Sequence, residues 1–203
     1  METFTELRGL VDNPHYHEQR RRCLAKLDIN TIDVPIAEIV SGFVNLPYCF
    51  SLQSCYGHFV LSSQQSPHNI EPLPMSDSIT TVEYRIAYIA LCIEDSNLGR
   101  ALFHGLGQIP LIDPEYIQFG CAEWFWERQV NSYALQVEHR RHMTKDRVCV
   151  DYQEALHIEK VRNQFFVQLE KLLQEQQDRN KSVSVDHNLV KFNSHLFPPP
   201  YEF

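Results

Sequence analysis

Apolar residues recur at helical spacing in four parts of the chain, and each part is predicted to form a helix. In the second helix, Asp33 precedes Pro35, and an acidic residue before a first-turn proline is typical of a helix N-terminus. We therefore expect the Asp33 carboxylate to accept hydrogen bonds from free amides of that helix. The fourth helix is the longest, and the run Asp151-x-x-Glu154 at its start resembles a capping box. The predicted helices cover residues 15–28, 33–44, 98–107 and 151–178.

Other segments alternate or carry continuous apolar residues, which is typical of strands. The clearest is 80–93, whose two faces are both mostly apolar, so we expect a central strand covered on both sides. A second segment is interrupted at Gly57, so it reads as a strand or a hairpin. The predicted strand segments are 48–61, 80–93, 117–126, 132–137 and 147–150.

Helices and strands therefore intermix along the chain, and we predict an α/β fold with a mixed sheet covered by helices. Residues 1–178 are expected to form a single domain. Residues 62–78 carry three prolines and five serines without periodicity, so they are expected to form a loop, which could act as a lid, an insertion or a connection. The aromatic residues of the tail, 179–203, indicate that it docks on its own core or on a partner.

Composition excludes several classes of protein. The chain has 203 residues, of which 43% are hydrophobic, enough to form a folded core. Its longest apolar run, 86–93, is far shorter than the roughly 20 residues of a membrane-spanning helix. The N-terminus shows no secretory signal, and the six cysteines are scattered, as in proteins with reduced thiols. We therefore expect a cytoplasmic protein that does not contact a membrane.

The net charge of −8 argues against strong nonspecific binding to nucleic acid. Two basic clusters remain, at 20–26 and 139–147, and we interpret them as solvated surfaces, with phosphate binding as the alternative. The common nucleotide-binding, zinc-protease and hydrolase motifs do not occur in the sequence.

The segment 53–58 has the most unusual chemistry of the chain, because a hydroxyl, a thiol, a glycine and an imidazole follow one another. In a regular strand Ser54 and Cys55 point to opposite faces, and Gly57 allows a positive φ that turns His58 back toward either. One interpretation is a ligand-binding or catalytic turn with an activated thiolate. The other is a buried thiol followed by a glycine bulge. Cys55 and His58 could supply two metal ligands, but a second pair is missing from the sequence, so we expect no metal site.

The segment also carries a resemblance. Together with Asp33 and the apolar helix after it, the run Ser54-Cys55-x-Gly57 resembles the N-terminal signature of the tRNA wybutosine-synthesising N4-methyltransferase family, where the corresponding run is Ser-Ser-Cys-Ser-Gly-Arg. The order of downstream elements is also similar, over about residues 5–175. The departures are Gln53, Tyr56 and His58, which stand in place of Ser, Ser and Arg. The family's lysine and Trp-x-x-His-type segment is also missing, and the loop at 62–78 occupies that place.

The resemblance implies the α/β fold of that family and an S-adenosylmethionine-dependent methyl transfer to a tricyclic guanosine of tRNA. It places Ser54, Cys55 and Gly57 in the ligand site. We add His58 from its position in the turn, and Arg85 and Glu123 as orienting groups, because an unpaired charge on a strand is costly to bury. We assign no catalytic residue.

Three functions are therefore compatible with the sequence. The first is a protein that binds tRNA or a nucleotide-like molecule and uses S-adenosylmethionine for methyl transfer. The second is a non-catalytic binding or structural protein of the same fold, favoured by the missing arginine and the negative charge. The third is a thiol-based enzyme that uses Cys55. Assembly into a homo-oligomer is compatible with each of them.

Overall fold

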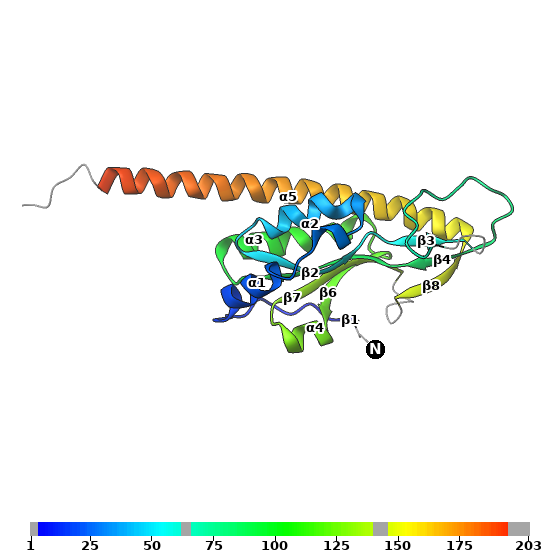
Figure 1. Ribbon diagram of the computed structural model, residues 1–203, viewed down its shortest axis with the longest axis horizontal. Helices are drawn as coiled ribbons and strands as arrows, with labels where there is room; N and C mark the ends of the chain where they lie inside the picture. Colours follow the sequence, from blue (N-terminus) through cyan, green and yellow to red (C-terminus); the bar gives the residue numbers. More distant parts are fainter. Residues whose placement is uncertain (1–3, 62–65, 140–145, 195–203) are drawn as a thin grey trace, which may run out of the picture.

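Two antiparallel sheets and one long helix form the framework (Figure 1). The computed structural model describes residues 4–61, 66–139 and 146–194, without the side chains of 4–5, 122–125 and 182–194. The larger sheet has the strand order β1-β6-β7-β5-β2, and the smaller has the order β3-β4-β8. The strands of the two sheets are β1 (Phe4–Thr5), β2 (Cys49–Cys55), β3 (His58–Val60), β4 (Thr81–Arg85), β5 (Ala87–Ile93), β6 (Ile117–Ala122), β7 (Ser132–Val137) and β8 (Arg147–Asp151).

Helices lie against the sheets, which confirms the predicted α/β class with a helix-covered sheet. The long helix α5 contacts strands of both sheets, and α2 and α3 pack between it and the larger sheet (Figure 1). The helices are α1 (Tyr16–Leu24), α2 (Ala37–Val44), α3 (Asn97–Leu106), α4 (Glu123–Arg128) and α5 (Tyr152–Ser194), with the short 3-10 helices η1 (Ile29–Thr31), η2 (Val34–Ile36) and η3 (Ile109–Ile112). Among the described residues, every helix is too short or too polar to cross a membrane.

The core lies between α5 and the two sheets. The apolar stripe of α5 faces it at Ile158, Val161, Phe165 and Leu169, all of which are fully buried. Asp151 accepts a hydrogen bond from the Glu154 N–H at 2.8 Å, as the predicted capping box requires of its first residue. The predicted end of this helix at residue 178 is wrong, since the helix continues to residue 194 and extends beyond the sheets (Figure 1). Docking of the 179–203 tail remains a prediction.

The segment predicted as one strand at 80–93 is divided between the two sheets. It forms β4 in the smaller sheet and β5 in the larger sheet, with a break at Ile86. β5 pairs with β2 on one side and β7 on the other, so its prediction as a central strand is confirmed. The segment at 48–61 is divided in the same way at Gly57, into β2 and β3, which lie in different sheets rather than in a hairpin.

The two breaks at which the chain passes from one sheet to the other, at Gly57 and Ile86, lie close together. Gly57 has a φ of +88°, and a Cβ at this position would come within 2.7 Å of the Cβ of Ala87, the first residue of β5. Glycine is therefore required by both the backbone conformation and the lack of space. The corner between β2 and β3 is thus fixed at the junction of the two sheets.

The prediction of a strand through residue 126 is wrong. β6 ends at Ala122, and the chain then forms the short helix α4. Alternation of residue types continues past Ala122, but β7 pairs with β6 only as far as Gly120 and β1 only as far as Ala122, so no described strand pairs with the backbone beyond that residue. Trp126 consequently lies on a helix, where its ring packs edge-on against Tyr133 at 5.7 Å between centroids.

Candidate functional site

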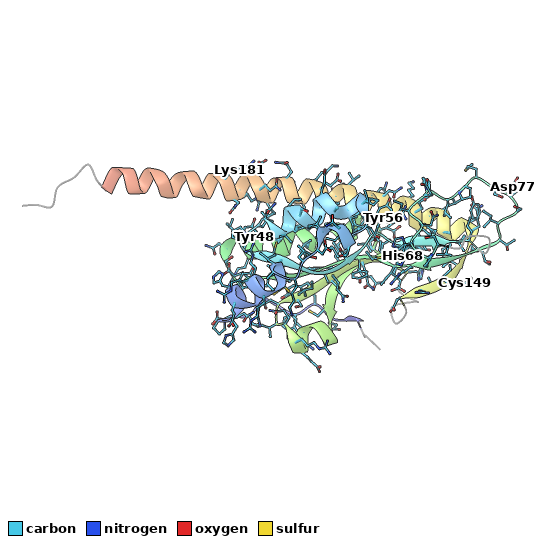
Figure 2. All side chains as sticks on the ribbon, viewed as in Figure 1. Tyr48, Tyr56, His68, Asp77, Cys149 and Lys181 are labelled. Carbon is cyan, nitrogen blue, oxygen red and sulfur yellow. The ribbon has the colours of Figure 1, made fainter. Side chains whose placement is uncertain are left out.

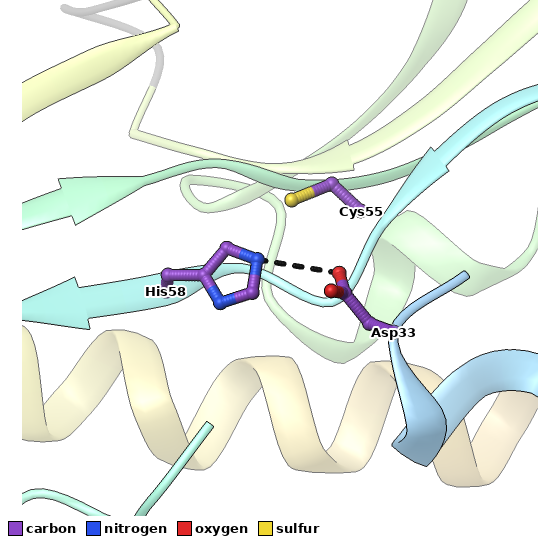
Figure 3. A group of neighbouring side chains, drawn as sticks. All are labelled: Asp33, Cys55 and His58. Atoms are coloured by element: carbon purple, nitrogen blue, oxygen red, sulfur yellow. Dashed lines mark ion pairs between the residues drawn. The ribbon is translucent and has the colours of Figure 1, made fainter. Parts of the chain in front are cut away.

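The corner between β2 and β3 brings together Asp33, Cys55 and His58 (Figure 3). Asp33 is the residue before η2, Cys55 is the last residue of β2 and His58 is the first residue of β3. One donor atom from each side chain lies within 4.8 Å of the other two. Asp33 and Cys55 are separated by more than twenty residues in sequence, and the fold brings them close together.

Asp33 does not have the role that the sequence predicts. Its side chain makes no capping hydrogen bond to η2. Instead, Oδ2 accepts a hydrogen bond from the backbone N–H of Tyr56 at 2.8 Å and lies 3.2 Å from Nε2 of His58. The hydrogen bonds from His58 and Tyr56 lower the pKa of Asp33 against the opposing effect of burial, which is the largest single influence on it. The carboxylate therefore holds the corner in place.

His58 is almost completely buried, with an exposed fraction of 1%. Its ring is fixed on two sides, because Nδ1 lies 3.2 Å from the carbonyl oxygen of Asn69 while Nε2 faces Asp33. The hydrogen bond with Asp33, followed by the interaction with Cys55, raises the pKa of His58 to about 10, although burial opposes this. The imidazole of His58 therefore has Asp33 and Cys55 on one edge and the Asn69 carbonyl on the other.

Part of the predicted 62–78 loop covers this corner. His68 packs edge-on against the His58 ring at 5.4 Å between centroids, next to the Asn69 carbonyl. Farther along, the N–H of Leu73 donates to Oε1 of Glu159 on α5 at 3.0 Å, and the Tyr152 hydroxyl donates to the Pro74 carbonyl. Residues 62–65 lie outside the described residues. Over 66–78 the loop without regular structure is confirmed, and it lies on the site as a cover.

The opposite side of the corner is held by α5. Nη1 of Arg162 donates to the Gly57 carbonyl oxygen at 2.9 Å, and the guanidinium lies 4.1 Å from the centroid of the Tyr56 ring. Arg162 is 2% exposed and lies 3.6 Å from Oε1 of Glu159. This buried arginine was missed because it sits in a helix rich in polar residues, where the sequence gives no sign that its side chain points inward.

The other residues predicted for the site have different positions. Ser54 is partly exposed and pairs with Ile89, whereas Cys55 pairs with Tyr88, so the expected opposite orientation of Ser54 and Cys55 is confirmed. Ser54 therefore faces away from the Asp33–Cys55–His58 group. Arg85 lies directly opposite His58 in the β3–β4 ladder and shares its face of the smaller sheet.

Glu123 does not belong to the site. It lies at the start of α4, beyond β6, and β6 is three strand positions away from β2 in the larger sheet. At the usual strand spacing this is roughly 14 Å across the sheet. Among the described residues β4 pairs with β3 and β8 and not with β6, so the strands of Arg85 and Glu123 are not adjacent, which was the condition for the two side chains to pair or to line one pocket.

The first basic cluster has a structural role. Arg20 donates to the carbonyl oxygens of Val44, Leu46 and Cys49, which ties α1 to the end of α2 and the start of β2. Arg22 pairs with Glu18 on the same helix. The interpretation of a solvated helix face is therefore wrong for Arg20, whose charge is used within the fold. The second cluster lies largely in 140–145, outside the described residues.

None of the six cysteines forms a disulfide, and Cys149, labelled in Figure 2, is the exposed one among them. Burial raises the pKa of the thiols of Cys23 and Cys121, and it raises the pKa of Cys92 to about 12. Cys55 is buried, with an exposed fraction of 8%. A nucleophile needs access to its substrate, so the geometry gives Cys55 a role within the corner rather than on the surface.

The chain matches no protein-family model, and no curated protein matches it significantly in sequence. Among solved structures, it is similar to the PH1069 protein from Pyrococcus horikoshii, with 10% identity over 83% of this chain and 95% of that chain and a TM-score of 0.43. It is also similar to a hypothetical protein from Aeropyrum pernix, with 12% identity over 72% of this chain and 98% of that chain and a TM-score of 0.38.

Proposed function

We propose that this chain binds tRNA or a nucleotide-like ligand at the corner between β2 and β3, and that it transfers a methyl group from S-adenosylmethionine to a base of tRNA. One observation carries the proposal. The two separate parts of the methyltransferase-like signature, Asp33 and the run Ser54-Cys55-x-Gly57, converge on one corner, where Asp33 binds the Tyr56 N–H at 2.8 Å.

The chemistry of methyl transfer suits such a corner. The methyl donor is already activated, so the protein accelerates the reaction mainly by aligning donor and acceptor. A rigid wall is then more useful than a strong nucleophile. Arg162 and Asp33 fix the corner through the Gly57 carbonyl and the Tyr56 N–H. The reduced thiols agree with a reducing compartment, and we propose the cytoplasm as the location.

Titration calorimetry with S-adenosylmethionine tests this function. The full chain should give a saturable heat with one site, and Asp33→Asn should weaken it because the corner loses an ion pair. Asp12→Asn is the matched control, since Asp12 is exposed and lies outside the site. Absence of a saturable heat in the wild-type chain would remove the methyltransferase proposal.

A second candidate is a non-catalytic binding or structural protein of the same fold. The observation that favours it is the burial of His58, which stands where the resembled motif has an arginine. An arginine there would reach a phosphate or carboxylate, whereas His58 is enclosed by Asp33 and Asn69. Binding of tRNA without any binding of S-adenosylmethionine would favour this second function.

A further inference from the structure

Three side chains with different donor atoms converge at the corner: a carboxylate, a thiol and an imidazole (Figure 3). Figure 3 shows the sulfur of Cys55 directed toward the same edge of the His58 ring that faces the Asp33 carboxylate. All three residues are buried or partly buried, and the side chain of Asp33 is 22% exposed. The group thus brings one oxygen, one sulfur and one nitrogen within 4.8 Å of one another.

The surroundings of His58 require a positive charge at this edge. Both ring nitrogens face acceptors, since Nδ1 lies 3.2 Å from the Asn69 carbonyl oxygen and Nε2 lies 3.2 Å from Oδ2 of Asp33. A neutral imidazole has one N–H and one lone pair. If Nδ1 carries the hydrogen and donates to Asn69, the lone pair of Nε2 points at a carboxylate. With that tautomer, the contact of Nε2 with Oδ2 becomes favourable when a second proton or a metal ion lies between the two atoms.

The separation of Nε2 of His58 from Oδ2 of Asp33 fits a metal ion between them. Zinc binds carboxylate oxygen at about 2.0–2.2 Å and imidazole nitrogen at about 2.0–2.1 Å, and at a tetrahedral angle these two ligand atoms are about 3.3 Å apart. The Nε2–Oδ2 separation here is 3.2 Å. A hydrogen bond from the second ring nitrogen to a backbone carbonyl is also the usual support of a metal-bound histidine. The Asn69 carbonyl supplies it, and the Tyr56 N–H supports the carboxylate.

We infer that Asp33, Cys55 and His58 form a binding site for a zinc-class divalent ion. Thiolate and imidazole ligands favour zinc, and they disfavour magnesium and calcium, which prefer oxygen. Within the described residues the group contains three protein ligands, and zinc is usually four-coordinate, so the fourth position would be taken by water or a small ligand. This site does not depend on methyl transfer. It departs from the expectation of no metal site, which rested on the lack of a second pair of ligands, because Asp33 adds a third ligand to Cys55 and His58.

Metal titration of the purified full chain, after treatment with a chelator, tests the site directly. Zinc should bind at one equivalent per chain, as measured by elemental analysis after dialysis. Cobalt(II) should give the near-ultraviolet charge-transfer absorption of a thiolate–cobalt bond, and zinc should displace it. Zinc should also stabilise the wild-type chain against urea denaturation, because a ligand that binds only the folded state shifts the folding equilibrium toward it. This last measurement needs no variant and so does not depend on how a variant folds.

Variants then identify the ligands. Asp33→Asn and Cys55→Ser should weaken zinc binding by more than the roughly 10–100-fold that loss of an outer partner causes. Cys149→Ser is the matched control, because Cys149 is exposed on β8 and its loss should leave affinity unchanged. A wild-type chain that binds no zinc, or that shows no thiolate–cobalt absorption, would overturn the inference and leave a second proton on His58 as the charge at this edge. S-adenosylmethionine binding is measured separately, so failure of one proposal does not decide the other.

Discussion

Arg162 on α5 donates a hydrogen bond from Nη1 to the carbonyl oxygen of Gly57 at 2.9 Å, although the two residues are 105 positions apart. The same guanidinium lies over the ring of Tyr56 and 5.0 Å from the centroid of Phe59. Its positive charge is buried and is balanced by Glu159 at 3.6 Å. The long helix therefore holds the corner between the two sheets through one side chain.

Replacement of this side chain should destabilise the fold. Arg162→Met keeps the length and much of the apolar stem, but it removes the positive charge beside Glu159 and the donor to the Gly57 carbonyl. Removal of one member of a buried charged pair usually costs about 3–5 kcal/mol, and we expect a loss of about 3 kcal/mol in the free energy of unfolding, measured by urea denaturation. Lys160→Met, at an exposed position on the same helix, is the control. A cost for Arg162→Met as small as that of Lys160→Met would show that the buried charge does not support the corner.

Gly57 should tolerate no side chain. Gly57→Ala places a Cβ 2.7 Å from the Cβ of Ala87, in a backbone conformation with a φ of +88°. Strain of this kind costs about 1–3 kcal/mol, and the steric clash adds to it. We therefore expect the free energy of unfolding to fall by roughly 2 kcal/mol or more. Gly9→Ala is the control, because a Cβ there meets no atom within 4 Å. Equal stability of the two variants would mean that the corner is less tightly packed than the structure shows.

The thiols should differ in their reaction with iodoacetamide under native conditions. Cys149 is exposed and should react first, and Cys23, which is partly buried and has a raised pKa, should follow slowly. Cys55 and the other buried thiols should react only after unfolding, as read by mass spectrometry. Selective alkylation of Cys55 near neutral pH, before Cys149, would instead support the thiol-based enzyme considered from the sequence.

Local patterns in the sequence predicted the order of the elements and the glycine corner, because helix periodicity and a positive-φ glycine depend on neighbouring residues. The partners of Asp33 could not be predicted in this way. Local signals predict that its carboxylate caps the helix that follows. In the structure the carboxylate instead accepts a hydrogen bond from the Tyr56 N–H and pairs with His58, and both residues lie more than twenty positions away. Long-range partners thus took the place of the local cap.

Strand pairing limited the prediction of the site for a similar reason. Arg85 and Glu123 were both assigned to the site as orienting groups, although the sequence could not show whether their segments are adjacent. A break at Ile86 sends β4 into the smaller sheet, while Glu123 follows a strand of the larger sheet. Sequence patterns show that a segment is extended, but they do not show which segment it pairs with. Arg162 was missed because a single inward-facing charge does not change the apolar period of α5.

Glu138 should make the stability of the fold depend on pH. Its side chain is 1% exposed, and burial, followed by the charge of Asp146, raises its pKa to about 8. Within the described residues, Oε2 accepts from Nε2 of Gln136 at 3.3 Å, while Oε1 has no hydrogen-bond partner. A buried carboxyl with so few donors is more stable in its protonated form.

The sign of this dependence follows from proton binding. Above the ordinary glutamate pKa of about 4.3 the unfolded chain releases this proton, whereas the folded chain keeps it up to about pH 8. Folding therefore binds a proton in this range, so this contribution to stability is complete at low pH and decreases as pH rises, by up to about 1.4 kcal/mol per pH unit.

Glu138→Gln cannot ionise, and it should remove this contribution to the slope. Urea denaturation at several values between about pH 5 and pH 8 measures the difference between the two chains. Glu127→Gln, at an exposed position, should leave the slope as it is in the wild-type chain. If Glu138→Gln also follows the wild-type slope, Glu138 is already ionised in the fold, and the cluster around Gln136 must supply donors that stabilise its charge.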